Sequence, residues 1–377
     1  MDFNALLRLM VQKNASDLFI TAGYPPSLKI HGKIMPLSQT SLSSEQSRSM
    51  VLSVMNGQQR SEFEKTLECN FAISPFEIGR FRVNVFQQRN SIGMVLRKIE
   101  TKIPKFEELG LPPSLQEISM TKRGLVIFVG GTGTGKSSSL AAMVGYRNEN
   151  GNGHIITIED PIEYLHQHKN CIITQREVGI DTESYDAALK NTLRQAPDVI
   201  LLGEIRSRET MNYAIAFAET GHLCLSTLHA NSANQAMDRI INFFPEERRA
   251  QLLMDLSLNL KAVIAQLLIP SVDGKARSVA VEILLNTPLA ADLILKGEVH
   301  ALKELMARSN EAGMKTFDQD LFDLYMAGKI SYDNAIRYAD SANEVRLKIK
   351  LASKGAMGKL GEDLEEAQLV ESDVRRR

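Results

Sequence analysis

The chain has 377 residues, 44% of them hydrophobic and 24% charged, which predicts two or three domains with ordinary buried cores. Its 44 basic and 45 acidic residues give a net charge of −1, which argues against a dedicated nucleic-acid-binding protein. The three cysteines, Cys69, Cys171 and Cys224, form neither a metal-binding pattern nor a disulfide framework, and they fit a reducing cytoplasm. No segment has the apolar length of a signal peptide or of a membrane span.

Residues 1–100 predict a compact α/β domain that has no catalytic constellation of its own. Ser43 and Gln46 form a candidate capping box, and Asn56-Gly57 is expected to end the helix that this box begins. The stretch GRFRVNVFQ alternates apolar and polar residues, as a half-buried strand does. The expected elements are helices over 1–13 and 42–55 and strands over 18–21, 28–30, 79–87 and 93–99.

Two arginines, Arg82 and Arg97, lie on the neighbouring strands 79–87 and 93–99 of this domain. Composition alone favours reading them as solvated charges at a sheet edge. Residues 101–114 follow, and they contain three prolines and a glycine. Because proline cannot donate to a strand ladder, we interpret 101–114 as the linker between two domains.

Residues 125–139, LVIFVGGTGTGKSSS, join a buried strand to a helix expected over 138–147. The pattern G-x-x-x-x-G-K-[ST] in that context predicts a phosphate-binding loop. Glycines let backbone N–H groups turn towards a phosphate, and the helix N-terminus adds its positive dipole end. Lys136 would neutralise the β- and γ-phosphates, and the Ser137 hydroxyl would bind Mg²⁺. The predicted ATP-binding residues are Gly130, Gly131, Thr132, Gly133, Thr134, Gly135, Lys136, Ser137 and Ser138. The alternative is a chance glycine-rich turn.

Carboxylates follow two further predicted strands, at the end where ligands collect in parallel α/β sheets. After the strand 154–158 come Glu159, Asp160 and Glu163, one of which could hold and deprotonate the attacking water. The alternative is an acidic turn before a proline-started helix. Glu204 ends the strand 198–205, DVILLGEI, where a carboxylate suits Mg²⁺ beside a phosphate loop.

A third strand, expected over 223–227, is bracketed by His222 and His229. Neutral imidazoles at strand ends could sense the γ-phosphate or its Mg²⁺ ion, although single histidines are more often structural. The alternation of strands and helices from 115 to 345 predicts a parallel sheet with helices on both faces. The remaining expected elements are helices over 207–220, 245–268, 287–296, 318–327 and 332–339 and a strand over 279–285. Residues 346–377 form a C-terminal tail, expected to be disordered, with partner binding as the alternative.

Several motifs together resemble the type II secretion and type IV pilus motor ATPases, specifically the PilT/PilU retraction group. GGTGTGKS resembles their Walker A motif and TIEDPIEYLH, at 157–166, their aspartate box. LRQAPDVILLGEIRS, at 193–207, resembles the Walker B signature, and TGHLCLSTLHANSA, at 220–233, the histidine box. The segment ASDLFITAGYPP, at 15–26, resembles their PAS-like N-terminal domain.

The resemblance implies a PAS-like α/β domain, a RecA-like P-loop ATPase domain and a ring-shaped homohexamer, with ATP between the two domains of one subunit and a neighbour. Glu163 would activate water, and Glu204 would act at Mg²⁺ together with Ser137. His222 and His229 would read the γ-phosphate. Arg82 and Arg97 would swing onto the phosphates as the N-terminal domain closes, which replaces the interpretation as edge charges.

The sequence departs from the family pattern at three places. Ser207 stands where the Walker B signature usually has aspartate, and Phe19 stands where the N-terminal box usually has histidine. The segment LAADLILK, at 289–296, lacks the arginine and the charge of its PilT counterpart, AIRNLIRE, a segment tied to retraction. Together with the C-terminal tail, this favours the accessory PilU branch. The tetra-cysteine zinc element of the secretion ATPases is absent, which argues against the extension and secretion branches.

The resulting hypothesis is an ATP-hydrolysing hexameric motor that assists type IV pilus retraction in twitching motility, in the cytoplasm at the inner-membrane base of the pilus. Its expected partners are a PilT-like paralogue and an inner-membrane platform protein, and nucleic acid is not among them. Three alternatives stay open: a stand-alone PilT-like motor, an ATP-binding coupling module with little motor activity, and a nucleic-acid translocase with the same core.

Overall fold

The computed structural model describes residues 2–310 and 313–353, and their contacts divide the chain into two compact units. The first unit comprises the residues up to Ile103 together with Asp160–Gln167 and Arg176–Ser184. The second comprises Pro104–Glu159, His168–Gln175 and the residues from Tyr185 onward. The predicted division at about residue 100 therefore misses two later segments that belong with the N-terminal unit. Of the described helices, none combines the length and apolar character needed to cross a bilayer.

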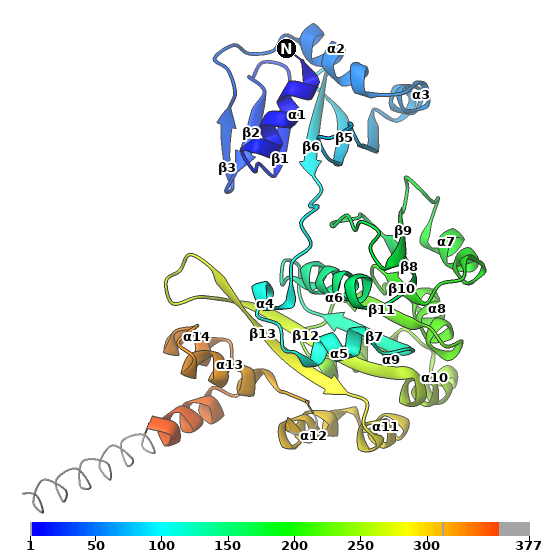
Figure 1. Cartoon of the computed structure of the whole chain (residues 1–377), viewed down its shortest axis with the longest axis vertical. Coiled ribbons are helices and arrows are strands. Elements are labelled where there is room, and N and C mark those ends of the chain that lie inside the picture. The colour runs from blue at the N-terminus through cyan, green and yellow to red at the C-terminus, as the bar shows by residue number, and fades with distance from the viewer. Residues whose placement is uncertain (1, 311–312, 354–377) are drawn as a thin grey trace, which may run out of the picture. The chain divides into compact units, whose positions relative to one another are not determined.

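The N-terminal unit is a six-stranded antiparallel sheet with helices packed on it, drawn in blue and cyan in Figure 1. The strand order is β3-β2-β1-β6-β5-β4, so the predicted hairpin β5–β6 lies inside the sheet and not at its edge. Apolar side chains of these strands, such as Phe81 and Val83, form its core with α1 and α2. The elements are α1 Phe3–Gln12, β1 Asp17–Ile20, β2 Ser27–Ile30, β3 Lys33–Pro36, α2 Ser44–Val54, α3 Gly57–Thr66, β4 Glu68–Ile73, β5 Phe81–Gln88 and β6 Ser91–Lys98.

The predicted capping box at the start of α2 is confirmed. The Ser43 hydroxyl accepts the Gln46 N–H, and the Gln46 side chain accepts the Ser43 N–H in return. The helix α2 ends at Val54, just before Asn56-Gly57 as predicted, but Asn56 also caps a new helix, α3, through a second capping box with Gln59. Asparagine stops one helix and starts another equally well, which is why the sequence pattern missed α3.

The predicted linker over 101–114 is partly helical, and most of it belongs to the second unit. The helix α4 Phe106–Leu109 lies within it, and α5 Ser114–Ser119 begins at its end. Phe106 and Leu111 are buried in the core of the second unit, which they share with Leu115. Hydrophobic burial therefore ties this proline-rich segment to the second unit, and only residues 101–103 stay with the N-terminal unit.

The second unit is built on a seven-stranded sheet in the order β13-β12-β7-β11-β10-β8-β9. Strands β12, β7, β11, β10 and β8 pair in parallel, as the alternation of elements predicted, whereas β13 pairs antiparallel with β12. The α/β class is thus confirmed in both units. The strands are β7 Gly124–Val129, β8 Gly153–Glu159, β9 Cys171–Glu177, β10 Val199–Leu202, β11 Leu223–Leu228, β12 Leu260–Pro270 and β13 Arg277–Leu285.

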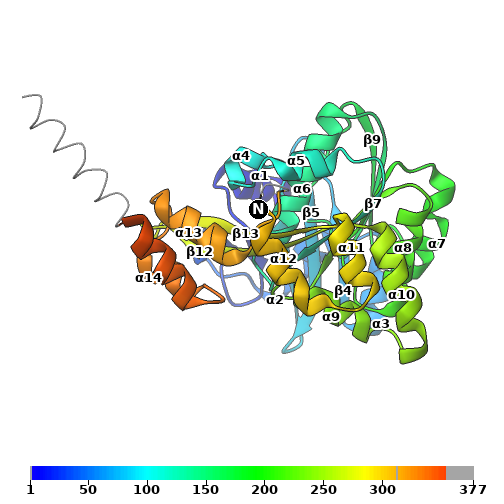
Figure 2. The same cartoon turned by 90° about the horizontal axis from the view of Figure 1, so that it is seen from below.

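Helices of the second unit connect these strands and continue beyond β13. Figure 2 shows α10 beside α11, and α13 beside β13, in agreement with their contacts. Residues 354–377, which include most of the predicted tail, lie outside the described residues. The helices are α6 Lys136–Asn150, α7 Tyr185–Thr192, α8 Arg208–Glu219, α9 Ala233–Asn242, α10 Glu246–Asn259, α11 Pro288–Leu295, α12 Leu302–Arg308, α13 Phe317–Met326 and α14 Tyr332–Arg337, with 3-10 turns at Leu193–Gln195 and Val299–Ala301.

The predicted helix over 245–268 is wrong in its second half. The helix α10 ends at Asn259, and the next residue begins the strand β12. The run LKAVIAQLLIP pairs with β7 on one side and β13 on the other, and its side chains are buried on both faces. A strand buried on both faces loses the apolar–polar alternation, so its leucine spacing also fits a helix.

Candidate active site

The phosphate-binding loop lies where its motif predicted, between the end of β7 and the start of α6. Gly135 precedes the helix with φ of 89°, in the left-handed region, and Lys136 is the first helical residue. The Lys136 Nζ atom donates to the carbonyl oxygens of Gly130 and Gly131, both at 2.8 Å. The lysine therefore already lies across the loop, where its charge can meet a phosphate.

Two of the loop glycines are required by close contacts. A Cβ atom at Gly130 would lie 2.5 Å from Thr134 Oγ1 and 2.8 Å from the Gln266 carbonyl oxygen. At Gly135 it would lie 2.8 Å from Gln266 Nε2. No sequence motif includes Gln266, although it is the single amide inside the apolar run of β12.

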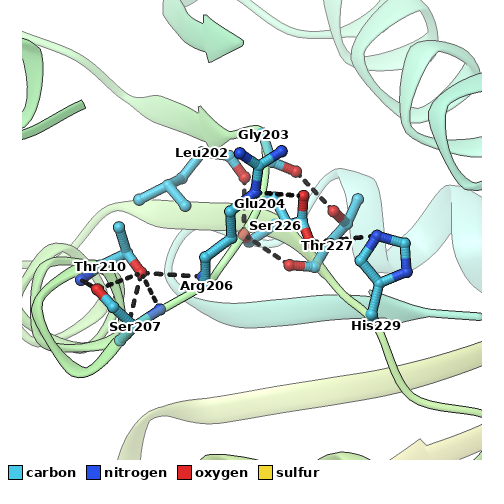
Figure 3. Close-up of polar contacts among 9 residues, drawn as sticks. All are labelled: Leu202, Gly203, Glu204, Arg206, Ser207, Thr210, Ser226, Thr227 and His229. Atoms are coloured by element: carbon cyan, nitrogen blue, oxygen red, sulfur yellow. Dashed lines mark hydrogen bonds and ion pairs between the residues drawn. The ribbon is translucent and has the colours of Figure 1, made fainter. Parts of the chain in front are cut away.

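Glu204 follows β10 at the same edge of the sheet as the loop, since β10 and β7 both pair in parallel with β11. Its side chain is only 17% exposed, and both carboxylate oxygens have a partner (Figure 3). Arg206 Nε donates to Oε2 at 2.7 Å, and His229 Nε2 lies 3.2 Å from Oε1. The structure thus brings together two of the predicted residues, Glu204 and His229.

Backbone and hydroxyl contacts between the ends of β10 and β11 fix this pair. Ser226 Oγ donates to the Leu202 carbonyl and Thr227 Oγ1 to the Gly203 carbonyl, both at 2.7 Å (Figure 3). The Ile205 N–H donates in turn to the Thr227 carbonyl at 2.8 Å. These bonds join the segment that carries Glu204 to the segment that leads to His229.

Ser207, which replaces an aspartate of the family pattern, caps the helix α8. Its hydroxyl accepts the Thr210 N–H at 3.4 Å, and the Ser207 N–H donates to Thr210 Oγ1 at 3.1 Å (Figure 3). Serine and aspartate are comparable N-cap residues, so the substitution preserves the start of the helix. The departure therefore leaves the Glu204 segment intact.

His222 does not lie at the phosphate loop of its own chain, so its expected contact with the γ-phosphate stays a prediction. It precedes β11, whose first residue pairs with Gly124 at the start of β7, whereas the loop follows the end of β7. The six residues of β11 separate the two ends by roughly 20 Å. The His222 ring contacts Thr220 Oγ1 and the Phe217 carbonyl at the end of α8.

Arg82 and Arg97 lie directly opposite each other on β5 and β6 of the N-terminal unit. Arg97 Nε donates to Asp17 Oδ1 at 2.8 Å, and its side chain is 68% exposed, whereas Asp17 is buried. Burial raises the pKa of Glu177, while the nearby charges of Arg82 and Arg80 act to lower it. The structure therefore confirms that the two arginines are cross-strand neighbours, and it shows a carboxylate near each.

Glu163 groups with the N-terminal unit, four residues after the end of β8. Its carbonyl accepts the Glu100 N–H at 3.3 Å, and the Leu165 N–H donates to the Glu100 carbonyl at 2.9 Å. These bonds anchor the backbone of the aspartate box to the end of the N-terminal sheet. The Glu163 side chain is exposed. Its catalytic role stays a prediction.

The donors at the second unit's loop fit a nucleotide and a magnesium ion. Loop N–H groups, Lys136 and the N-terminus of α6 are the groups that bind a polyphosphate. Ser137 and Glu204 supply the oxygen ligands that Mg²⁺ prefers. Among the described residues, no cluster of three or more His, Cys, Asp or Glu side chains could hold a metal by itself.

Comparisons with known proteins identify the family of this chain. The model of the family described as type II/IV secretion system protein matches residues 2–317. The type IV pilus ATPase PilU of Pseudomonas aeruginosa is 67% identical over 354 residues, which are 94% of this chain and 93% of that protein. The type IV pilus retraction ATPase PilT of the same bacterium is 40% identical over 335 residues, 89% of this chain and 97% of that protein.

A solved structure is also similar over nearly the whole chain. The crystal structure of the pilus retraction motor PilT with bound ADP has a TM-score of 0.85 and 38% sequence identity. The match covers 91% of this chain and 98% of that chain. The similarity therefore includes both the N-terminal unit and the unit with the phosphate loop.

Proposed function

This chain belongs to the family of type II/IV secretion system proteins and is an ATPase, and from that premise we propose that it powers type IV pili in twitching motility as an accessory retraction motor. The observation that carries the proposal is the loop at 130–137, with Lys136 lying across its carbonyls and Glu204 at the same sheet edge. The accessory role is favoured over a stand-alone role because the chain is 67% identical to PilU and 40% identical to PilT.

In the proposed reaction, ATP and water give ADP and phosphate. The loop N–H groups and Lys136 bind the phosphates, and Glu204 with Ser137 would hold the metal. Mg²⁺, when bound, neutralises the charge that develops on the transferring phosphoryl group. Glu163 orients the attacking water and accepts its proton. His229, which pairs with Glu204, contacts the γ-phosphate.

The proposal includes a homohexamer, in which Arg82 and Arg97 of an N-terminal unit reach the phosphates at a subunit boundary. Guanidinium groups supplied at such a boundary stabilise the transition state and couple hydrolysis to domain movement. In this assembly the motor acts on the cytoplasmic side of the inner membrane, with a PilT-like paralogue and a platform protein as partners. The near-neutral net charge disfavours the alternative of a nucleic-acid translocase.

The site assignment is tested by Lys136→Ala and Glu204→Ala, each measured for ATP hydrolysis with Mg²⁺. Each change is expected to lower turnover at least a hundredfold, since a phosphate-neutralising charge or a metal ligand is lost. Lys190→Ala, which removes an exposed lysine paired with Asp186, is the control and should keep full turnover. Unchanged hydrolysis in either site variant would contradict the assignment.

The accessory role is tested in cells that also carry a PilT-like protein. Deletion of this chain alone should weaken retraction and leave part of it, because the paralogue remains. Complete loss of retraction would instead favour a stand-alone motor. Normal motility with the Lys136→Ala chain would favour a coupling module that needs no hydrolysis.

A further inference from the structure

Beyond the residues of the recognised motifs, we propose that Gln266 is a positioning residue that holds the phosphate-binding loop in its nucleotide-binding shape. The proposal rests on the assignment of nucleotide binding to this loop. Gln266 lies on β12 and is 1% exposed. None of the motifs that identified the loop includes it.

The register of the sheet explains why this residue reaches the loop. Strand β12 runs parallel to β7, and Ala265 pairs with Val129, the last residue of β7. Gln266 is therefore the first residue of β12 that lies beyond the end of β7, beside the segment where β7 gives way to Gly130. On its other side it pairs with Val281 of β13, which fixes the backbone.

The Gln266 side chain makes two hydrogen bonds that link the loop to the helix behind it. Its Nε2 donates to the Thr134 carbonyl at 2.8 Å, and its Oε1 accepts from Ser139 Oγ at 2.7 Å. The Thr134 carbonyl can only accept, which fixes the orientation of the amide. Ser139, itself fully buried, lies in the first turn of α6.

Contacts with the two loop glycines add a steric constraint to these bonds. The Gln266 carbonyl lies against Gly130, and the Gln266 amide nitrogen lies against Gly135, each 2.8 Å from where a Cβ atom would be. The loop is thus held at both ends and at the peptide between Thr134 and Gly135. With its carbonyl held by the amide, that peptide keeps the orientation in which loop N–H groups face a phosphate. Such pre-organisation lowers the ordering cost of binding.

The test compares Gln266→Met and Ser139→Ala with the unaltered full-length chain, using a fluorescent ADP analogue and steady-state hydrolysis. Methionine is similar in length and makes neither bond, so the Kd for ADP should rise on the order of tenfold. Because the loop binds ground-state phosphates, the KM for ATP should rise by a similar factor, and kcat should fall by less than about threefold. Ser139→Ala keeps the bond to Thr134 and should raise the Kd for ADP by about threefold.

Gln251→Met is the matched control, since it makes the same chemical change at an exposed glutamine on α10 that bonds only to Asp255 in the described structure. It should leave both the Kd and the KM unchanged. A Kd for ADP within twofold of the unaltered chain in folded Gln266→Met overturns the proposal. If that variant does not fold, the same result in Ser139→Ala overturns it. Failure of the unaltered chain to bind ADP would instead overturn the nucleotide assignment itself.

Discussion

Arg97 and Arg82 face each other across two strands, yet they have different local surroundings. Arg97 is largely exposed and paired with the buried Asp17, whose other oxygen accepts a bond from Ser16 Oγ. Arg82 interacts electrostatically with the buried Glu177. Guanidinium groups that help catalysis at a subunit boundary have to leave or share such partners as the boundary closes.

Arg82→Ala and Arg97→Ala are each expected to lower kcat for ATP about tenfold or more and to change ADP affinity by less than threefold. The reason is that these cations would stabilise charge developing in the transition state more than charge in the ground state. Hydrolysis and ADP titrations measure the two effects. A collapse of ATP affinity would mean that these arginines hold ground-state nucleotide.

The expected effect on the stability of the N-terminal unit distinguishes Arg97 from Arg82, and a third arginine serves as the control. Arg97→Ala leaves the buried Asp17 without its cation and should destabilise the N-terminal unit by about 1–3 kcal/mol. Arg48→Ala, an exposed arginine on α2, should change neither stability nor kcat. Thermal unfolding of each variant therefore shows how much of any loss of activity at Arg97 comes from the fold.

At the scale of the elements, Glu282 of β13 joins the start of α9 to the sheet. The Ala233 N–H, at the start of α9, donates to Glu282 Oε1 at 2.8 Å, while Oε2 is buried and has no hydrogen-bond partner among the described residues. Burial raises the pKa of Glu282 to about 7, with Asp340 acting in the same direction. Lys303 and the N–H groups of Ala233 and Phe317 act to lower it.

The stability of the ATPase unit should therefore fall as the pH rises from about 4.5 to about 7 through this group. Over that range the folded protein holds a proton that the unfolded chain releases. A rise in pH therefore lowers the free energy of unfolding. The difference amounts to about 3 kcal/mol at most. Glu282→Gln should remove this part of the pH dependence, as urea denaturation at pH 5 and pH 8 would measure.

Glu298→Gln makes the same chemical change at an exposed position of the same unit and is the control for this prediction. An equal loss of stability between pH 5 and pH 8 in the unaltered chain and in Glu282→Gln would contradict the prediction. The carboxyl would then titrate alike in the folded and unfolded states.

On the scale of the whole molecule, the proposed ring makes a prediction about mass. The purified chain with ATP and Mg²⁺ should have a mass of about 251 kDa, six times the 41.9 kDa of one chain. A nucleotide bound between subunits stabilises their association by mass action. Light scattering after size exclusion, with and without nucleotide, measures this. A mass of one chain under both conditions would contradict the ring.

Much of the ATPase unit could be predicted because its elements carry local signals. The loop glycines and the Thr287-Pro288 start of α11 each determine local geometry by themselves. The strand β12 could not be predicted, since a run of apolar residues buried on both faces fits helix and strand alike. His222 shows a related limit: nearness in sequence to an active-site strand does not say at which end a residue lies.

The contacts of Glu204 have a consequence for the order in which the metal ion and the nucleotide bind. In the isolated chain, its two carboxylate oxygens are held by Arg206 and His229. A bare divalent cation would have to displace both partners and gain few oxygen ligands in exchange. A cation that is already bound to the triphosphate has most of its oxygen ligands from the phosphates and from water. The metal ion and the nucleotide are therefore expected to bind together. A subunit without nucleotide should then also lack the metal ion.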